Sequence, residues 1–284
     1  TRYPMREIAA SSLFAVVVWY NPASDYSLVI DDYAHHLGGV VVVDNSAGDN
    51  RSLIRSSQAN IYYLPQYHNV GIARALNIGM QYALQRGATH VLTMDQDSRF
   101  REGDIERFIT ICNAYPYREE TAVFAPVHSK VGDLSLPTYQ EPIAVMTSGD
   151  IIDLDDLRLL GPMREAFFID LVDNEFCARI LLHEKRVVTV NAVSLLHQLG
   201  NGTKYNSFWH KHFQDHAPWR YYYMARNMLT IIREYPNVRS YHKKQWRKFT
   251  KRLFLYDTHH KWTKIYYLIR GVKDYLCHRY GQMP

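Results

Sequence analysis

The sequence predicts an α/β fold with a Rossmann-like, mainly parallel sheet flanked by helices. Two continuous apolar runs, LFAVVVWY at 13–20 and GVVVVDNS at 39–46, are typical of strands that are buried on both faces. A helical pattern at 70–87 separates a short third strand at 61–66 from a fourth strand, HVLTMDQD, at 90–97. Because strands that alternate with helices are joined by crossovers, we expect them to run parallel within one sheet.

The other elements follow from shorter patterns. After Glu119 the apolar runs become shorter and less regular, but no repeat or low-complexity linker interrupts the chain. Helices are predicted at 24–37, 153–161, 173–184 and 217–235, and further strands at 121–129, 143–149 and 187–197. We therefore expect one continuous domain over 1–238 and a separate helical tail over 239–284.

Composition is typical of a cytoplasmic globular protein. Of the 284 residues, 47% are hydrophobic, which is enough for a sizeable core. No run of eighteen apolar residues predicts a transmembrane helix, and the apolar run near the start continues into the α/β pattern rather than forming a signal peptide. Three scattered cysteines predict neither a disulfide framework nor a zinc site, so a reducing cytosol is expected.

The tail carries the basic character of the chain. Residues 239–284 hold 12 Lys and Arg against two acids, whereas the first 238 residues hold 21 against 26. On a helical wheel Trp246, Phe249, Leu253 and Tyr256 share one side, and basic residues occupy the other. Such a helix is typical of a peripheral protein on an anionic membrane, here the inner face of the plasma membrane. Packing on the domain or an oligomer contact is the alternative, and the acidic body argues against nucleic acid as a partner.

Two aspartates, Asp95 and Asp97, follow the fourth strand in the segment MDQDS. Open α/β sheets bind ligands at the carboxyl ends of their strands, and two carboxylates one residue apart can approach the same divalent cation. Mg²⁺ or Mn²⁺ at this place neutralises the charge that a leaving diphosphate gains. Two solvated acids in a turn are the alternative, which the position at a strand end disfavours.

Other polar residues follow the predicted strands and open the helix at 70–87. Asp44 ends the second strand, where its carboxylate can accept a hydrogen bond from a nucleobase N–H, although Asp-Asn-Ser is also common turn chemistry. Asn69 is a candidate helix cap or nucleotide contact, and Gly71 permits a tight entry into the helix. Arg74 is equally compatible with a phosphate contact and with a surface salt bridge.

The segment FFIDLVDNEFCARI contains the candidate general bases. Asp173 is predicted to open a helix, whose N-terminus favours the ionised carboxylate that a base needs. A plain N-cap aspartate would have the same position. Asp170 and Glu175 lie close by, so the spacing does not single out one acid.

Two later segments add further candidates. His197 ends a strand in LLHQLG and is either a metal or phosphate ligand or a structural histidine. In WRYYYMARN, Arg220 and Arg226 are candidates for lining a diphosphate or acceptor cleft together with Tyr221 and Tyr222. A core-facing aromatic stripe is the alternative.

A resemblance emerges when these segments are read in chain order. VVVWYNP, VVVDNS, NVGIARALNIG, MDQDS, TSGDIID, FIDLVDNEFCAR, LLHQLG and RYYYMARN resemble the inverting family 2 glycosyltransferases with the GT-A fold. Among them, they are most similar to bacterial rhamnosyltransferases of O-antigen and polysaccharide assembly, over about 13–235. The resemblance implies a nucleotide-sugar donor, with dTDP-L-rhamnose as the best match, and a glycan or lipid-linked acceptor.

The resemblance also implies roles for individual residues. It implies that Asp95 lies near the ribose or the metal and that Asp97 binds the metal. Many relatives have Glu-Asp where this chain has Val172 and Asp173, so Asp173 aligns with the base and Asp170 is the alternative. The donor-site candidates are Tyr20, Asn21, Asp44, Asn69, Arg74, Asp95, Gly149, Arg220 and Arg226, and the metal candidates are Asp95, Asp97 and His197.

Three other functions stay open at this point. A UDP-hexose-dependent glycosyltransferase would share the same fold and motifs. A nucleotidyltransferase requires a Gly- and Arg/Lys-rich phosphate loop after the first strand, which VVVWYNPASDYS lacks. A non-catalytic nucleotide- or glycan-binding protein needs no separate base beside a metal site, and this chain has candidates for both.

Overall fold

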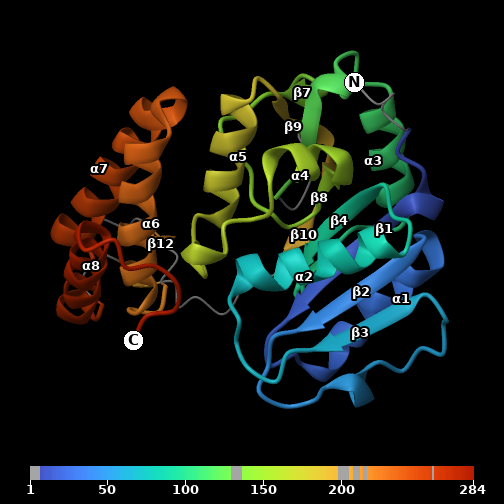
Figure 1. Cartoon of the computed structure of the whole chain (residues 1–284), viewed down its shortest axis with the longest axis horizontal. Helices are drawn as coiled ribbons and strands as arrows, with labels where there is room; N and C mark the ends of the chain where they lie inside the picture. The colour runs from blue at the N-terminus through green and yellow to red at the C-terminus, as the bar shows by residue number, and fades with distance from the viewer. Residues whose placement is uncertain (1–6, 129–135, 198–204, 207–211, 214–215, 258) are drawn as a thin grey trace.

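A computed structural model describes residues 7–128, 136–197, 205–206, 212–213, 216–257 and 259–284. Its centre is an eight-stranded sheet with the order β3-β2-β1-β4-β8-β6-β9-β7 (Figure 1). The strands are β1 (Leu13–Trp19), β2 (Gly39–Asp44), β3 (Ile61–Pro65), β4 (His90–Asp95), β6 (Thr121–Val127), β7 (Tyr139–Gln140), β8 (Asp150–Asp153) and β9 (Arg186–Ser194). The predicted α/β class is confirmed.

The first half of the sheet is parallel, as the sequence predicts. Strand β1 lies between β2 and β4, and β3 lies outside β2, all in parallel. In the second half, β8 runs antiparallel to both β4 and β6. The stretch 143–149, predicted as a strand, is irregular, and the strand begins only at Asp150, after a turn in which Gly149 has a φ of 85°. Because β8 is antiparallel, Asp150 lies at the edge where β4 ends.

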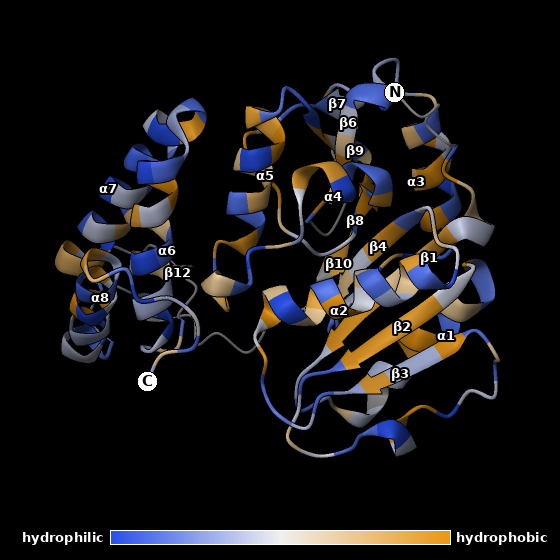
Figure 2. Ribbon diagram, viewed as in Figure 1, coloured by the Kyte–Doolittle hydropathy of each residue, from blue (hydrophilic) through white to orange (hydrophobic). Residues whose placement is uncertain are grey.

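Helices cover both faces of the sheet, because successive residues of a strand point to opposite sides. On β1, Phe14, Val16 and Val18 belong to the core beneath α2, α4 and α5, and the alternate residues belong to the core beneath α1 and α3. Figure 2 shows the hydrophobic residues concentrated on β2 and neighbouring strands. The bounds are α1 (Ser27–His36), α2 (Ile72–Gln85), α3 (Asp104–Asn113), α4 (Leu154–Leu160) and α5 (Val172–Leu182).

Three C-terminal helices, α6 (Arg220–Glu234), α7 (Arg239–Leu255) and α8 (Lys261–Leu276), form a group of their own beside the sheet (Figure 1). Leu253 of α7 is buried with residues of α6 and α8, and Trp246 and Phe249 pack on the same cluster. The apolar side predicted for this helix therefore packs on the protein. None of the helices in the described part of the chain combines the length and apolar character needed to cross a bilayer.

The two acids of the tail are both buried in this helical group. Lys264, which has no exposed surface, forms an ion pair with Asp257 at 2.8 Å between Nζ and Oδ2. The hydroxyl of Tyr221 donates to Asp257 at 3.3 Å, and that of Tyr222 donates to Asp274 at 2.7 Å. These two tyrosines thus join α6 to the tail and do not line a cleft. With both acids internal, the exposed charged side chains in the described part of the tail are basic.

Candidate active site

The ends of four strands bring the predicted donor-site residues to one edge of the sheet. In the register of the parallel strands, Trp19 faces Asp44 on one side of β1, and Val18 faces Asp95 on the other. Asp150, the first residue of β8, lies opposite Thr93. The edge therefore carries three aspartates from three strands, as expected for the ligand-binding edge of an open α/β sheet.

Asp44 is held within the turn that follows β2. It has no exposed surface, and its oxygens accept hydrogen bonds from the Ser46 N–H, the Asn50 amide and the Tyr63 hydroxyl. Burial by itself would raise the pKa of Asp44, but hydrogen bonds from Ser46, Tyr63 and Asn50 outweigh it and hold the pKa below its usual value. An ionised Asp44 organises this turn, and direct contact with a nucleobase requires Asn50 or Tyr63 to move.

The ends of β1 and β4 are joined by Gln96, the residue between the two predicted metal ligands. Its side-chain oxygen accepts from the Tyr20 N–H at 2.8 Å, and its amide donates to the Tyr20 carbonyl at 3.2 Å. Asn21 has a φ of 46° and donates its N–H to the Ser46 hydroxyl at 2.7 Å. The ring of Tyr20 is 51% exposed at this edge, where a flat base can stack on it. The sequence analysis missed Gln96, because its role depends on the pairing of β1 with β4.

Asn69 shapes the entry into α2. Its side-chain oxygen accepts from the Gly71 N–H and from the amide of Asn45, and the Asn45 oxygen accepts from the Val70 N–H. Gly71 has a φ of 86°, and a side chain there would lie 2.8 Å from the Phe168 carbonyl oxygen. Glycine thus lets α2 begin against the segment that precedes Asp173. Arg74, one turn further along, is exposed.

Asp173 lies in the first turn of α5 and is partly buried. Its Oδ1 accepts two hydrogen bonds from Asn174, at 2.7 Å from the N–H and 3.0 Å from the amide. Burial raises the pKa of Asp173, the hydrogen bonds from Asn174 oppose this, and the negative charge of Asp170 raises the pKa further. A carboxylate with a raised pKa is a better proton acceptor than an ordinary one.

Asp170, the alternative base, is bound by Arg220. The guanidinium donates two hydrogen bonds to the carboxylate, one of them from Nε at 3.1 Å. Burial would lower the pKa of Arg220, but the hydrogen bonds and charge of Asp170, and then the charge of Asp95, raise it above the usual value. Arg220 is therefore bound to Asp170, in the segment before the candidate base, and interacts electrostatically with Asp95 at the end of β4. Glu175 is bound by Arg179 and Tyr235 in the interior.

Asp150 is an acid that the sequence analysis quoted only as part of a motif. Asp150 is 3% exposed, and its buried Oδ1 has no hydrogen-bond partner among the described residues. Burial raises its pKa well above the usual range, and the charges of Asp173 and Asp95 add to the effect. Asp150 therefore lies close to both Asp95 and Asp173, and it joins the two halves of the site. Only the antiparallel direction of β8 brings it there.

The segment from Phe167 to Leu171 adopts a backbone that is unusual for residues other than glycine. Phe168, Asp170 and Leu171 have φ values of 65°, 64° and 62°. Left-handed residues of this kind are held by their surroundings and cluster at functional sites. Helix α6 holds this segment in place, because the Asn227 amide donates to the carbonyls of Phe167, Ile169 and Asp170.

Arg226 takes part in the same restraint and does not face the strand ends. It is fully buried, and its guanidinium donates to the carbonyl oxygens of Ala166, Phe167 and Gly281. The expectation that Arg226 lines a diphosphate cleft does not match this placement, because its donors are used by the backbone. Its place on the inner side of α6 became clear only from the packing of that helix.

Part of the central sheet matches a known protein family in sequence. Residues 37–127, from the start of β2 to the end of β6, match the family described as Glycosyl transferase family 2. The chain carries a family 2 glycosyltransferase domain. The dTDP-rhamnosyl transferase RfbF of Shigella flexneri is 27% identical to this glycosyltransferase over 245 residues, which are 79% of this chain and 81% of RfbF.

Solved structures show that the glycosyltransferase has a GT-A fold. TarS of S. aureus, residues 1–349, has a TM-score of 0.54 at 14% identity, over 92% of this chain and 81% of that chain. GalNAc-T7, in a crystal structure with UDP, GalNAc and Mn²⁺, has a TM-score of 0.54 at 12% identity. That match covers 66% of this chain and 43% of GalNAc-T7, so the glycosyltransferase spans less than half of that protein.

The two acids after β4 fit a metal that is shared with a diphosphate. Asp95 is exposed and Asp97 is partly buried. In the described part of the glycosyltransferase, no three His, Cys, Asp or Glu side chains converge as a metal-binding group. Mg²⁺ usually binds through one or two carboxylates and completes its shell with water and substrate phosphates, so two aspartates suffice. The short strands β5 (Ser98–Arg99) and β10 (Leu196–His197) pair so that His197 faces Ser98, but the His197 side chain lies outside the described residues.

The structure brings together most of the predicted site. Tyr20, Asn21, Asp95 and Asp97 lie at the ends of β1 and β4, and the Gly149 N–H donates to the Thr93 carbonyl beside them at 2.6 Å. The charge of Asp173 acts on Asp150, and Arg220, which binds Asp170, is affected by the charge of Asp95. Arg226 lies in the interior.

Proposed function

We propose that this chain is an inverting, metal-dependent rhamnosyltransferase of cell-surface polysaccharide synthesis, such as O-antigen assembly. It moves L-rhamnose from dTDP-L-rhamnose to a hydroxyl of a glycan or lipid-linked acceptor. The observation that carries the proposal is the position of the buried Asp150 beside the end of β4, where the charges of both Asp95 and Asp173 act on it. We infer that the acids suited to a metal–diphosphate group and a separate base belong to one site. The similarity to RfbF favours the donor.

The mechanism that fits this arrangement is a single in-line displacement. Asp173 takes the proton of the acceptor hydroxyl while that oxygen attacks the anomeric carbon. The bond between this carbon and the diphosphate oxygen breaks, and its electron pair leaves with the nucleoside diphosphate. Attack on the face opposite the leaving group inverts the anomeric configuration.

The negative charge that develops on the leaving diphosphate is neutralised by residues near the same edge of the sheet. Arg220 is oriented by Asp170 and interacts electrostatically with Asp95, and we propose that it contacts the leaving diphosphate. A bound Mg²⁺ or Mn²⁺, held by Asp95 and Asp97 and by His197 as a proposed third ligand, supplies further neutralisation of the diphosphate. Tyr20, Asn21 and Arg74 are proposed to contact the nucleotide. We assign catalysis to residues 1–238 and an accessory role to residues 239–284.

The donor and the metal are tested together. The purified chain is incubated with a glycolipid extract as acceptor and with dTDP-L-rhamnose, UDP-glucose or UDP-galactose, with Mg²⁺ or with EDTA. We expect release of dTDP with Mg²⁺ and loss of that release with EDTA. Release of UDP alone would assign a UDP-hexose donor, and release of the sugar 1-phosphate, with the nucleoside monophosphate moved to the acceptor, would indicate a nucleotidyltransferase. Absence of any release would indicate a binding protein.

We further propose that α8 places the enzyme on an anionic membrane. Trp262, Tyr266, Ile269 and Leu276 are 80%, 56%, 59% and 68% exposed, and their spacing puts them along one side of the helix. Basic residues are exposed on α7, which packs against α8, and each contributes about 1 kcal/mol on an anionic leaflet. Exposed aromatic and aliphatic side chains beside cations are typical of interfacial helices.

Sedimentation with vesicles of phosphatidylglycerol and phosphatidylcholine tests the membrane proposal. We expect the chain to sediment with anionic vesicles and to lose most of this binding when Trp262 and Ile269 are both changed to serine. The matched control is Leu28→Ser, because Leu28 is 65% exposed on α1, away from the tail. Equal sedimentation of the double variant and the wild type would contradict the proposal.

A further inference from the structure

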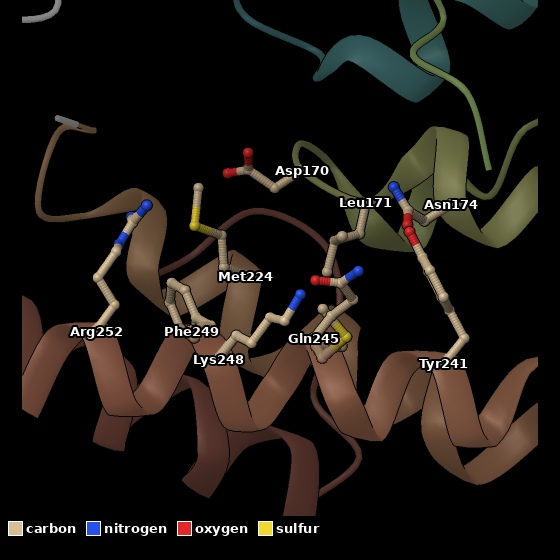
Figure 3. A pocket seen from close by; sticks show the side chains of 10 residues that line it. Asp170, Leu171, Asn174, Met224, Tyr241, Gln245, Lys248, Phe249 and Arg252 are labelled. Atoms are coloured by element: carbon tan, nitrogen blue, oxygen red, sulfur yellow. The ribbon is translucent and has the colours of Figure 1, made fainter. Parts of the chain in front are cut away.

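A cavity of about 430 Å³ lies between the segment that carries the base and the C-terminal helices. Asp170, Leu171 and Asn174 form one wall, and Met224 and Met228 of α6 form the floor. Figure 3 shows Gln245, Lys248 and Arg252 extending from α7 toward the Asp170 segment across this space. The cavity is large enough for a small saccharide. Asp173 immediately precedes the lining residue Asn174 in α5 and is not itself a lining residue.

The lining of the cavity has two chemically different parts. Phe249 and the two methionines provide apolar surface, and Phe249 is held in place by stacking on Tyr221, with ring centroids 5.3 Å apart. Lys248 and Arg252 are one helical turn apart and bring two cationic groups to the same wall. Aromatic faces suit the apolar face of a sugar, and two adjacent cations suit a phosphate or a diphosphate.

The electrostatics of the cavity favour an anionic ligand. Asp170 is the one acid among the lining residues, and it is already bound by Arg220 through two hydrogen bonds. The exposed ammonium group of Lys248 therefore meets no competing carboxylate of the cavity wall. Arg220 binds Asp170 of the cavity wall, and the charge of Asp95, where the donor diphosphate is proposed to bind, also acts on Arg220. The two proposed ligand sites are thus linked through the Asp170–Arg220 pair.

We propose that this cavity binds the acceptor as a phosphorylated saccharide, with its sugar against Phe249 and Asn174 and its phosphate on Lys248 and Arg252. The inference rests on the proposed function, because it takes Asp173 as the base that receives the acceptor proton. The acceptor is bound by α7, so the tail that was predicted as an appendage forms part of the site. A lipid-linked sugar diphosphate and a free sugar phosphate share this chemistry.

The test is a binding measurement that does not depend on turnover. Saturation-transfer NMR is recorded with α-glucose 1-phosphate while saturating dTDP and Mg²⁺ block the donor site. We expect a signal that weakens about tenfold in Lys248→Gln, the effect of one charge-assisted hydrogen bond. Lys251→Gln is the matched control, because Lys251 is exposed on the same helix and does not line the cavity. Methyl α-glucoside, which lacks the phosphate, should give a much weaker signal.

A second variant, a lipid-like ligand and a separate measurement of dTDP binding distinguish the possible outcomes. Gln245→Trp should fill the cavity and abolish the signal, and if that variant does not fold, Lys248→Gln decides. No signal with the wild type, or one equally strong in Lys248→Gln and Lys251→Gln, would overturn the assignment. An octyl diphosphate ester of glucose that binds more tightly than glucose 1-phosphate indicates a lipid-linked acceptor, and equal binding indicates a free one. Calorimetry of dTDP alone tests the donor site, so its failure is distinguished from failure of the cavity.

Discussion

Replacing Asp173 by asparagine is expected to lower kcat by about 100- to 10,000-fold, the usual contribution of a general base. Asparagine keeps the size of the side chain and its ability to accept from the Asn174 N–H, but it cannot take the acceptor proton. Donor affinity should change little, because Asp173 is proposed to face the acceptor. Transfer rates under saturating donor and calorimetric titration with dTDP measure the two quantities separately.

The pH dependence distinguishes Asp173 from Asp170. Burial and the charge of Asp170 raise the pKa of Asp173, so activity should fall as the pH drops through a value above that of an ordinary carboxyl group. In Asp170→Asn this acidic limb should persist but move to lower pH, because the neighbouring negative charge is gone. In Asp173→Asn the residual activity should show no such limb. If Asp170→Asn removed the limb and Asp173→Asn retained normal turnover, Asp170 would be the base.

Replacing Arg226 by methionine is expected to lower the free energy of unfolding by about 3 kcal/mol or more. Methionine keeps much of the aliphatic stem but removes the donors that satisfy the buried carbonyls of Ala166, Phe167 and Gly281. Each of those carbonyls would lose a charge-assisted hydrogen bond, and the segment before the base would lose part of its restraint. Urea unfolding followed by circular dichroism measures the effect.

Arg233→Met is the matched control for this experiment. Arg233 lies on the same helix, but it is exposed and pairs with Glu234 at the surface, so its loss should cost less than about 1 kcal/mol. If Arg226→Met does not fold, Asn227→Ala tests the same restraint, because it removes the bonds to the carbonyls of Phe167, Ile169 and Asp170. Equal stability of the Arg226 and Arg233 variants would show that the restraint is unimportant.

The hydrogen bonds from Arg226 and Asn227 to the segment before Asp173 explain how this fold positions the proposed base. Asp173 follows three residues in left-handed conformations, which the isolated chain rarely adopts. Hydrogen bonds from α6 hold that segment, and α2 closes on it through the Ile72 N–H, which donates to the Phe168 carbonyl at 2.7 Å. The position of the base thus depends on two helices that are distant in sequence.

Local patterns were sufficient for the central part of the fold. The apolar runs of β1 and β2 predicted buried strands, because only strands covered on both faces tolerate continuous apolar sequence. The helical period of α2 and the acids at the end of β4 are also local features of the sequence. In the structure, the start of α2 and these acids lie at the same edge of the sheet. The predicted strand at 143–149 was wrong, because the turn at Gly149 delays β8 to Asp150.

What the sequence determined by itself is the order of strands and helices and the types of residue that follow each strand, since both depend on near neighbours in the chain. The tertiary structure decided the partners of those residues. It bound Asp170 to Arg220, buried Arg226 beneath the base segment and brought Asp150 to the end of β4, where the charges of Asp95 and Asp173 act on it. It also placed α7 on α6, so that the basic tail faces the base. These contacts join segments far apart in the chain, and their energy depends on burial and shape complementarity that only the packed fold creates.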